Sequence, residues 1–316
     1  MKDYKIHNFD CVEYMYKLAE TGKQFDLSVF SPPFSSLYTY SNLSEDMGNS
    51  RESDDEFILH FNFFTDALYK VIKDGRNVCV HVQNPVRSMV NHGYVGIWDM
   101  RGEMIRLFEK SGFKYYGEVT IWKNPQAQSI RTKTQCLAFT QFIKDSLKSR
   151  PALADYLLIF KKGYNSNVKC TNKTAKNTHG ASERVDVTND DWINWASPIW
   201  ETNEDGFYLP YQTCWFNIKE TNTLNYRMAR QKEDERHLCP LQLDLIERCI
   251  RLWSNEGETV FSPFAGIGSE GYVSLKWKRK FDGCELKPEY AECAESNCKK
   301  AIEEMEFEKC QTSLFQ

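Results

Sequence analysis

The residues best suited to chemistry stand in the run Ser31-Pro32-Pro33-Phe34, which follows an apolar, strand-like segment at 25–30. The two prolines fix φ and remove two backbone donors, so that carbonyl oxygens are free to point into a site. The Ser31 hydroxyl and the Pro32 carbonyl can accept hydrogen bonds from both N–H groups of a planar amine, and Phe34 can stack on the ring that carries it. The bound nitrogen becomes more tetrahedral and can attack a sulfonium methyl group in line. Taken alone, the run is equally compatible with a rigid turn after a strand.

A second run, Phe264-Ala265-Gly266-Ile267-Gly268, follows the strand-like segment 258–261 and precedes a predicted helix. In this strand–turn–helix context, a pair of glycines lets the backbone pass close beneath a cofactor. Glu285 ends the next predicted strand, about twenty residues further on, where a carboxylate can accept hydrogen bonds from both ribose hydroxyls. An ordinary acid at the start of the following helix is the plainer explanation of Glu285. Together, the turn and the acid predict a cofactor site.

The elements that must position these runs alternate between strand and helix at both ends of the chain. Asp10 can cap a helix that continues to Leu18, and apolar residues at helical spacing predict a helix over 56–72. The further predicted elements are strands at 77–82, within 113–122, at 258–261 and at 280–284, and helices over 101–110, 241–253, 269–277 and 288–306. Such alternation predicts an α/β sheet with helices on both faces.

The composition is that of a globular protein and excludes several classes. The 316 residues are 41% hydrophobic and 14% aromatic, enough to bury a substantial core. No apolar run approaches the roughly 20 residues that span a bilayer, and the first residues lack the apolar core of a signal peptide. We therefore expect a cytoplasmic protein without a membrane partner. The 11 cysteines are scattered without a close Cys-x-x-Cys pair, which predicts neither disulfides nor a metal site.

Charge is distributed unevenly along the chain. The net charge is −4, yet residues 123–184 contain 12 Lys and Arg against 3 Asp and Glu, a local balance of +9 that leaves −13 for the remainder. A basic subregion on an acidic protein favours contacts with phosphates. A solvated basic loop has the same composition, so both interpretations stay open.

The two runs, with the Ser-Pro-Pro-Phe run first and the glycine turn last, resemble the beta group of the amino-group DNA methyltransferases. These enzymes methylate exocyclic nitrogens of cytosine or adenine. The segments 35–41 and 234–237 look like those of bacteriophage and prophage members. The resemblance covers nearly the whole chain and implies a doubly wound, Rossmann-like mixed sheet with an inserted target-recognition region. The implied parts are the catalytic part at 1–122, the target-recognition region at 123–236 and the cofactor-binding part at 237–316.

The resemblance also implies roles for individual residues. The catalytic residues would be Ser31, Pro32, Pro33 and Phe34. S-adenosylmethionine would be bound by Asp10, Cys11, His237, Pro240, Ser262, Phe264, Gly266, Gly268 and Glu285. DNA phosphates would be contacted by Lys123, Arg131, Lys133, Lys148 and Arg150.

Ser262 departs from the family pattern. Members often carry Asp at this place, two residues before the phenylalanine of the glycine turn, where it holds the amino group of the cofactor. A neutral hydroxyl can still accept, but it loses a charge-assisted hydrogen bond worth roughly 1.5–3 kcal/mol. Asp10 and Glu270 are the two acids that can compensate.

The Ser31-Pro32-Pro33-Phe34 segment is called the catalytic run below, and its first residue indicates which base is methylated. Serine is typical of cytosine-N4 enzymes, whereas adenine-N6 enzymes usually have Asp or Asn. We expect site-specific methylation of cytosine N4 in double-stranded DNA, with adenine N6 as the alternative, by a monomer or homodimer in a bacterial host cell. The base must leave the duplex because its amine is otherwise paired. RNA or protein-amide methylation and an inactive DNA-binding relative are the alternatives from other classes.

Overall fold

The computed structural model describes residues 2–33, 47, 54–121, 123, 128, 137, 139–145, 147, 149–163, 187–188, 191–192, 195, 214–215, 218–219, 221–225 and 240–314. The strands are β1 (Tyr4–Asn8), β2 (Phe25–Phe30), β3 (Ile72–Gln83), β4 (Val86–Arg87), β5 (Gly96–Ile97), β6 (Lys114–Ile121), β7 (Asp155–Lys161), β8 (Cys214–Trp215), β9 (Thr259–Ser262) and β10 (Lys280–Glu285). The helices are α1 (Cys11–Thr21), α2 (Asp54–Val71), α3 (Met89–His92), α4 (Met100–Lys110), α6 (Phe139–Lys144), α8 (Leu243–Trp253), α9 (Ser269–Lys276) and α10 (Pro288–Leu314).

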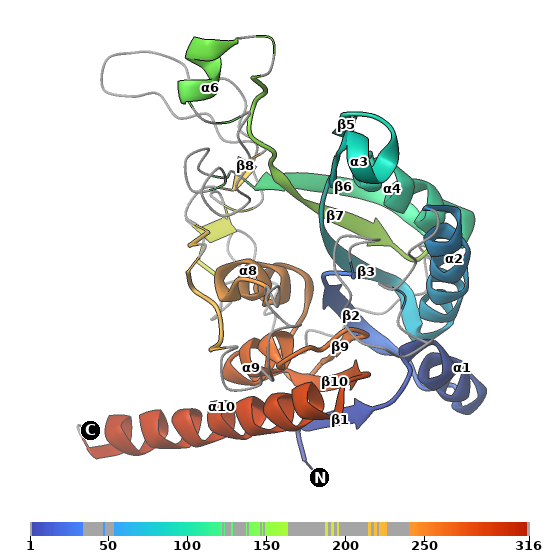
Figure 1. Ribbon diagram of the computed structural model, residues 1–316. Coiled ribbons are helices and arrows are strands. Elements are labelled where there is room, and N and C mark those ends of the chain that lie inside the picture. Colours follow the sequence, from blue (N-terminus) through green and yellow to red (C-terminus); the bar gives the residue numbers. More distant parts are fainter. Residues whose placement is uncertain are drawn as a thin grey trace, which may run out of the picture.

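One eight-stranded sheet joins the two ends of the chain, in the order β1-β10-β9-β2-β3-β7-β6-β8 (Figure 1). N-terminal β2 pairs in parallel with C-terminal β9, and β1 pairs in parallel with β10. Strand β7 runs antiparallel to both of its neighbours. The predicted doubly wound α/β sheet is confirmed. The N-terminal and C-terminal segments of the chain meet in this sheet.

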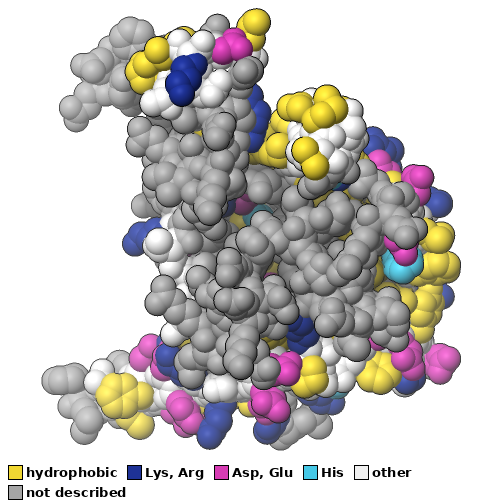
Figure 2. Space-filling view, in the orientation of Figure 1, with side chains coloured by type: hydrophobic (Ala, Val, Ile, Leu, Met, Phe, Trp, Pro, Cys, Tyr) yellow, Lys and Arg dark blue, Asp and Glu magenta, His cyan; other side chains and the backbone are white. Residues whose placement is uncertain are grey.

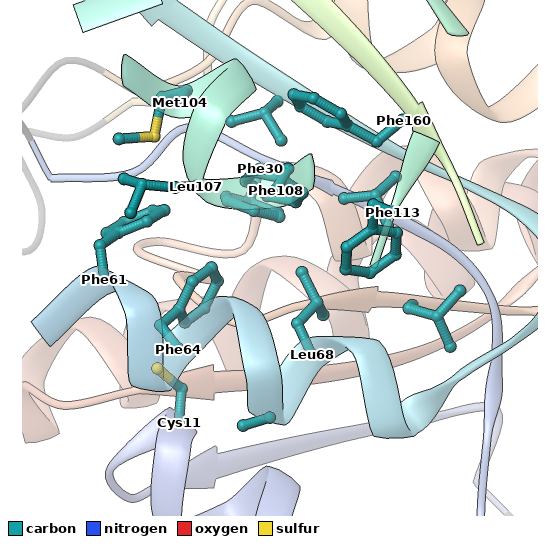
Figure 3. Packing of buried hydrophobic residues seen from close by; sticks show 14 of the residues in the cluster. Cys11, Phe30, Phe61, Phe64, Leu68, Met104, Leu107, Phe108, Phe113 and Phe160 are labelled. Atoms are coloured by element: carbon teal, nitrogen blue, oxygen red, sulfur yellow. The ribbon is translucent and has the colours of Figure 1, made fainter. Parts of the chain in front are cut away.

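Helices cover both faces of this sheet. On one face, α1, α2 and α4 pack on the strands through an aromatic-rich core. Figure 3 shows part of this core, in which Phe61 and Phe64 of α2 and Phe108 of α4 lie beside Phe30 and Phe160 of the strands. On the other face, α8, α9 and α10 bury a mainly aliphatic core that includes Leu27 and Val29 of the catalytic strand. β2 is therefore buried along its whole length, which makes the position of the residue after it rigid.

Most of the predicted elements are present, with ends that differ by a few residues from those expected. The helix expected over 56–72 is α2, which begins at Asp54, and the last helix continues to Leu314 rather than ending at 306. Asp10 caps α1 as predicted: its Oδ1 accepts from the backbone N–H of Glu13 at 2.8 Å. An acceptor at this place satisfies one of the unpaired N–H groups of the first helical turn.

The division at residue 123 needs a correction. β7 lies inside the expected target-recognition region 123–236, yet it is a central strand that pairs with β3 along seven residue pairs. β8, from the same region, pairs with β6 at the end of the sheet. The one sheet thus contains strands from all three expected parts of the chain.

Exposed apolar side chains gather on the segment that follows β3. Val90 of α3 is 94% exposed and Val95 is 76% exposed, and Figure 2 shows this segment as an apolar patch at the top of the molecule. The segment begins directly after the carboxyl end of β3. In the part of the chain that is described, no helix has the length and apolarity to span a membrane.

Candidate active site

The catalytic run begins at the carboxyl edge of the sheet. Ser31 directly follows β2, and its Oγ lies 3.1 Å from the carbonyl oxygen of His81 and 3.3 Å from Nδ1 of the same residue. Pro32 is buried and Pro33 is partly exposed. Phe34 lies outside the described residues. Ligands of open α/β sheets collect at this edge, and Ser31 and Pro32 lie there; their catalytic roles stay predictions.

His81 connects Ser31 to a buried ion pair. Its Nε2 lies 3.0 Å from Oδ2 of Asp155, and the same oxygen lies 2.7 Å from Nζ of Lys123. Burial by itself would raise the pKa of Asp155, but hydrogen bonds and charges from His81 and Lys123 outweigh it and lower the pKa. Asp155 is therefore a carboxylate. Ser31, His81, Asp155 and Lys123 form a continuous row in which each side chain contacts the next through a hydrogen bond or an ion pair.

Sequence reasoning missed two members of this row. His81 stands in the predicted strand 77–82 and was expected only to pack, while Asp155 opens a strand that was not predicted. Lys123 was expected to contact DNA phosphate, but the structure places its side chain, only 12% exposed, in the ion pair with Asp155. One feature of the sequence could have indicated this site: His81 is a polar residue near the end of an otherwise mainly apolar strand.

The glycine turn lies at the same edge, between β9 and α9. Gly266 has φ +52° and Gly268 has φ +84°, conformations that side chains disfavour. A Cβ on Gly268 would lie 2.8 Å from Cα of Ala294 in α10, whereas a Cβ on Gly266 would meet no atom within 4 Å. The absence of a side chain thus matters differently at the two glycines. At Gly268 it lets α10 pack closely, and at Gly266 it leaves one side of the backbone open.

Glu285 holds this turn in place. Its Oε2 accepts from the backbone N–H of Gly266 at 2.8 Å, and its Oε1 accepts from that of Lys287 at 2.9 Å. The side chain of Asn8 donates to the carbonyl oxygens of Glu285 and Leu286 at 3.0 and 2.8 Å. The end of β1 is thereby tied to the end of β10.

Asp10 and Cys11 follow β1 directly, so this tie brings them close to Glu285. The thiol of Cys11 is buried, and burial raises its pKa well above the ordinary value, with the charges of Asp10 and Glu285 adding to the effect. Cys11 is therefore a neutral thiol beside two acids. Asp10 and Cys11 from one end of the chain and Glu285 from the other thus lie at the same edge of the sheet.

Phe264 joins the glycine turn to the catalytic strand. Its ring packs against Phe30, the residue before Ser31, with centroids 5.6 Å apart, and against Phe64 of α2 at 5.1 Å. Edge-to-face and offset stacking of this kind stabilises aromatic clusters. The cofactor turn and the catalytic run therefore share one aromatic support.

Buried polar atoms beside the turn test whether S-adenosylmethionine fits here. Oγ of Ser262 and Oγ of Ser269 are buried and have no hydrogen-bond partner among the described residues. Buried hydroxyls without partners cost free energy, so their position on either side of the glycine turn suits a ligand with polar groups. Burial also raises the pKa of Glu270, the residue after Ser269, to about 8. These groups, with Glu285, fit a cofactor that has a ribose and cationic groups.

Two of the other expected site residues are described, and four are not. Pro240 is described and stands just before α8, and Arg150 donates through Nη1 to the carbonyl oxygen of Pro151 at 3.0 Å. Outside the described residues lie His237, Arg131, Lys133 and Lys148. Their expected roles stay predictions.

Comparison with known proteins finds methyltransferases among the relatives of this chain. Over 298 residues the chain is 24% identical to the type II methyltransferase M1.MboII of Moraxella bovis, in an alignment that covers 90% of this chain and 93% of that protein. It is 23% identical over 221 residues to the type II methyltransferase M.MjaI of Methanocaldococcus jannaschii, an alignment that spans 70% of this chain and only 60% of that relative.

Among solved structures, the chain is similar to TTHA0409 of Thermus thermophilus, a putative DNA modification methylase complexed with S-adenosyl-L-methionine. The TM-score is 0.61 at 18% identity, with 95% of this chain and 94% of that chain covered, which confirms the fold of S-adenosylmethionine-dependent methyltransferases. The family model described as DNA methylase, N6_N4_Mtase, matches residues 25–296. This match includes both the catalytic run and the glycine turn, and the chain therefore belongs to the S-adenosylmethionine-dependent amino-group DNA methyltransferases.

Proposed function

We propose that this protein methylates N4 of a cytosine that has been turned out of double-stranded DNA. The main observation in support of this proposal is the position of Ser31. Its hydroxyl lies at the carboxyl edge of the sheet, 3.3 Å from Nδ1 of His81. Ser31 also lies next to Phe30, which contacts the cofactor turn through Phe264. The amine acceptor and the cofactor turn are thus placed by the same packed side chains.

S-adenosylmethionine supplies the methyl group when it is bound. On the protein side, Gly266 offers an open backbone, Glu285 and Asp10 offer carboxylates for hydroxyl groups, and Ser262 offers a buried hydroxyl without a partner among the described residues. At the other end of the site, Ser31 Oγ and the Pro32 carbonyl accept from the two N–H groups of the base. Most of the rate would then come from orientation and from acceptors that are already in place.

Cytosine is favoured over adenine by the serine at position 31, because a neutral hydroxyl at this place is typical of the cytosine-N4 enzymes. Adenine N6 is the second candidate. Both bases present a ring nitrogen beside the exocyclic amine, so the same acceptors serve either one. The target must be unpaired while it reacts, since its amine is otherwise hydrogen-bonded inside the duplex.

The test is a product analysis. Purified protein is incubated with S-adenosylmethionine and unmethylated genomic DNA, and the DNA is digested to nucleosides and analysed by mass spectrometry. We expect N4-methylcytosine; N6-methyladenine would support the second candidate, and no methylated nucleoside would overturn the proposal. Ser31→Ala should lower the rate on the order of 10²-fold while cofactor binding is kept. Ser296→Ala, on an exposed position of α10, is the matched control.

A further inference from the structure

We propose that His81 is the positioning residue of this reaction and that it receives, through the Ser31 hydroxyl, the proton that the target amine loses. The inference depends on the proposed function, because it assigns a residue to the same site. It concerns the proton that leaves during attack: an amine that gains a methyl group must release one proton, and a base that takes up this proton as the bond forms speeds the methylation.

Strand register places the side chains of Ser31, His81 and Asp155 on one face of the sheet. Phe30 is paired with Val80, so Ser31 and His81 are the next neighbours on parallel strands. Gln83 is paired with Asp155, which puts Asp155 diagonally across from His81 on antiparallel strands, within reach of a long side chain. The measured contacts, 3.3 Å from Ser31 Oγ to Nδ1 and 3.0 Å from Nε2 to Asp155, use both ring nitrogens.

The hydrogen bonds around His81 are satisfied in two protonation states. In the neutral ring, Nε2–H donates to Asp155 and Nδ1 accepts from the hydroxyl of Ser31. In the charged ring, Nδ1–H donates to Ser31 Oγ, and the Ser31 hydroxyl turns to the carbonyl oxygen of His81, 3.1 Å away. If His81 served packing alone, it would not need the Ser31 hydroxyl beside it. That hydroxyl can donate either to Nδ1 or to the carbonyl oxygen of His81.

The surroundings of His81 favour a temporary positive charge. Its side chain is only 10% exposed, and that of Asp155 only 5%. Among the described residues, the charged groups that face the ring are Asp155 from β7 and Lys123 from the segment after β6. Oδ1 of Asp155 is buried without a partner in the described part of the chain, which leaves acceptor capacity for a charged ring.

The proton transfer balances as follows. The amine nitrogen forms a bond to the methyl carbon, and the electron pair of the broken carbon–sulfur bond returns to sulfur. As this bond forms, one N–H proton passes to Ser31 Oγ while the hydroxyl proton of Ser31 passes to Nδ1 of His81. Asp155 stabilises the imidazolium, which later gives its proton to water. No other reactant is required.

The experiment measures single-turnover methylation of DNA against pH for the wild type, His81→Asn, Asp155→Asn and His92→Asn. Asparagine keeps a polar group near the place of Nδ1 but cannot take up a proton. We expect the wild-type rate to rise through roughly pH 5–8, the range in which histidines commonly titrate. His81→Asn should be slower by about 10²- to 10³-fold without this rise, and Asp155→Asn slower by on the order of tenfold or more. His92→Asn, on α3 away from the row, should behave as the wild type.

Binding of S-adenosylmethionine, measured by calorimetry, shows whether each variant is folded. If His81→Asn binds the cofactor and keeps the wild-type rate and pH profile, the inference is overturned while the proposed function stands. A wild-type profile that is flat over this range overturns it as well, even if His81→Asn does not fold. A wild type that methylates no base in DNA removes both the proposed function and the inference.

Discussion

The backbone N–H of Gly266 donates to Oε2 of Glu285 at 2.8 Å, so the cofactor turn is held by the acid that ends the neighbouring strand. The other carboxylate oxygen of Glu285 accepts from Lys287 N–H. The same side chain therefore shapes the turn and faces the place where the ribose is expected. We therefore expect one carboxylate both to shape the turn and to bind the ribose.

Glu285→Gln is predicted to weaken cofactor binding. The amide has only one acceptor oxygen for two backbone donors, and a hydrogen bond to a charged group contributes about 1.5–3 kcal/mol. We expect the Kd for S-adenosylmethionine, measured by calorimetry, to rise about 10- to 100-fold. The matched control is Glu289→Gln, at an exposed position in α10. Equal Kd values for the two variants would contradict the role of Glu285.

Gly268→Ala is predicted to destabilise the fold more than Gly257→Ala. Both glycines have positive φ, +84° and +79°, but only at Gly268 would the new Cβ lie 2.8 Å from backbone of α10. The strained conformation costs about 1–2 kcal/mol in either variant, and overpacking adds about 1–3 kcal/mol at Gly268. Urea unfolding measures the difference. A loss of stability at Gly257 as large as at Gly268 would contradict the close approach of α10.

Ser262→Ala is predicted to separate stability from cofactor binding. Removing a buried hydroxyl without a partner should leave the free energy of unfolding of the ligand-free protein unchanged or raise it by about 1 kcal/mol. Binding of S-adenosylmethionine should weaken, because the hydroxyl is expected to accept from the cofactor's amino group. Ser274→Ala is the control: its hydroxyl is also buried and unpartnered among the described residues, but it lies within α9 rather than beside the turn. Equal binding by both variants would remove Ser262 from the site.

The buried carboxyl of Glu270 is predicted to make stability fall as pH rises. Burial is the main cause that raises its pKa from 4.5 to about 8, with the charge of Glu285 adding to it. Between these values the folded protein holds a proton that the unfolded chain has lost, so the free energy of unfolding decreases with pH in this window by up to a few kcal/mol. Below about pH 4.5 and above about pH 8, the ionisation of Glu270 no longer changes the free energy of unfolding with pH.

Glu270→Gln removes this ionisation, and urea unfolding at pH 5, 6.5 and 8 tests it. The variant should resemble the wild type at pH 5 and be the more stable protein at pH 8. Glu289→Gln, exposed at the start of α10, should show no such divergence. A wild type whose stability rises steadily from pH 5 to pH 8 in parallel with Glu270→Gln would contradict the buried acid.

Much of the cofactor site could be predicted from sequence because its residues act through local backbone geometry. The glycine turn, the acid at the end of the next strand and the cap at Asp10 each depend on a strand followed within a few residues by a turn or helix. Their meeting at one edge also followed, since parallel strands bring their carboxyl ends together. The structure confirms that Asn8 and Glu285 tie these ends to each other.

The row beyond Ser31 was decided by tertiary structure alone. His81 and Asp155 are 74 residues apart, and neither stands in a local pattern that distinguishes a polar partner from a packed strand residue. The antiparallel strand β7 lies in a segment whose composition suggested a DNA-reading insert, so Asp155 and Lys123 were assigned to the wrong surroundings. Local sequence determines which segments become strands and turns. Which side chains meet across the sheet depends on strand order and register, because contacts between distant segments form only when the whole sheet is assembled.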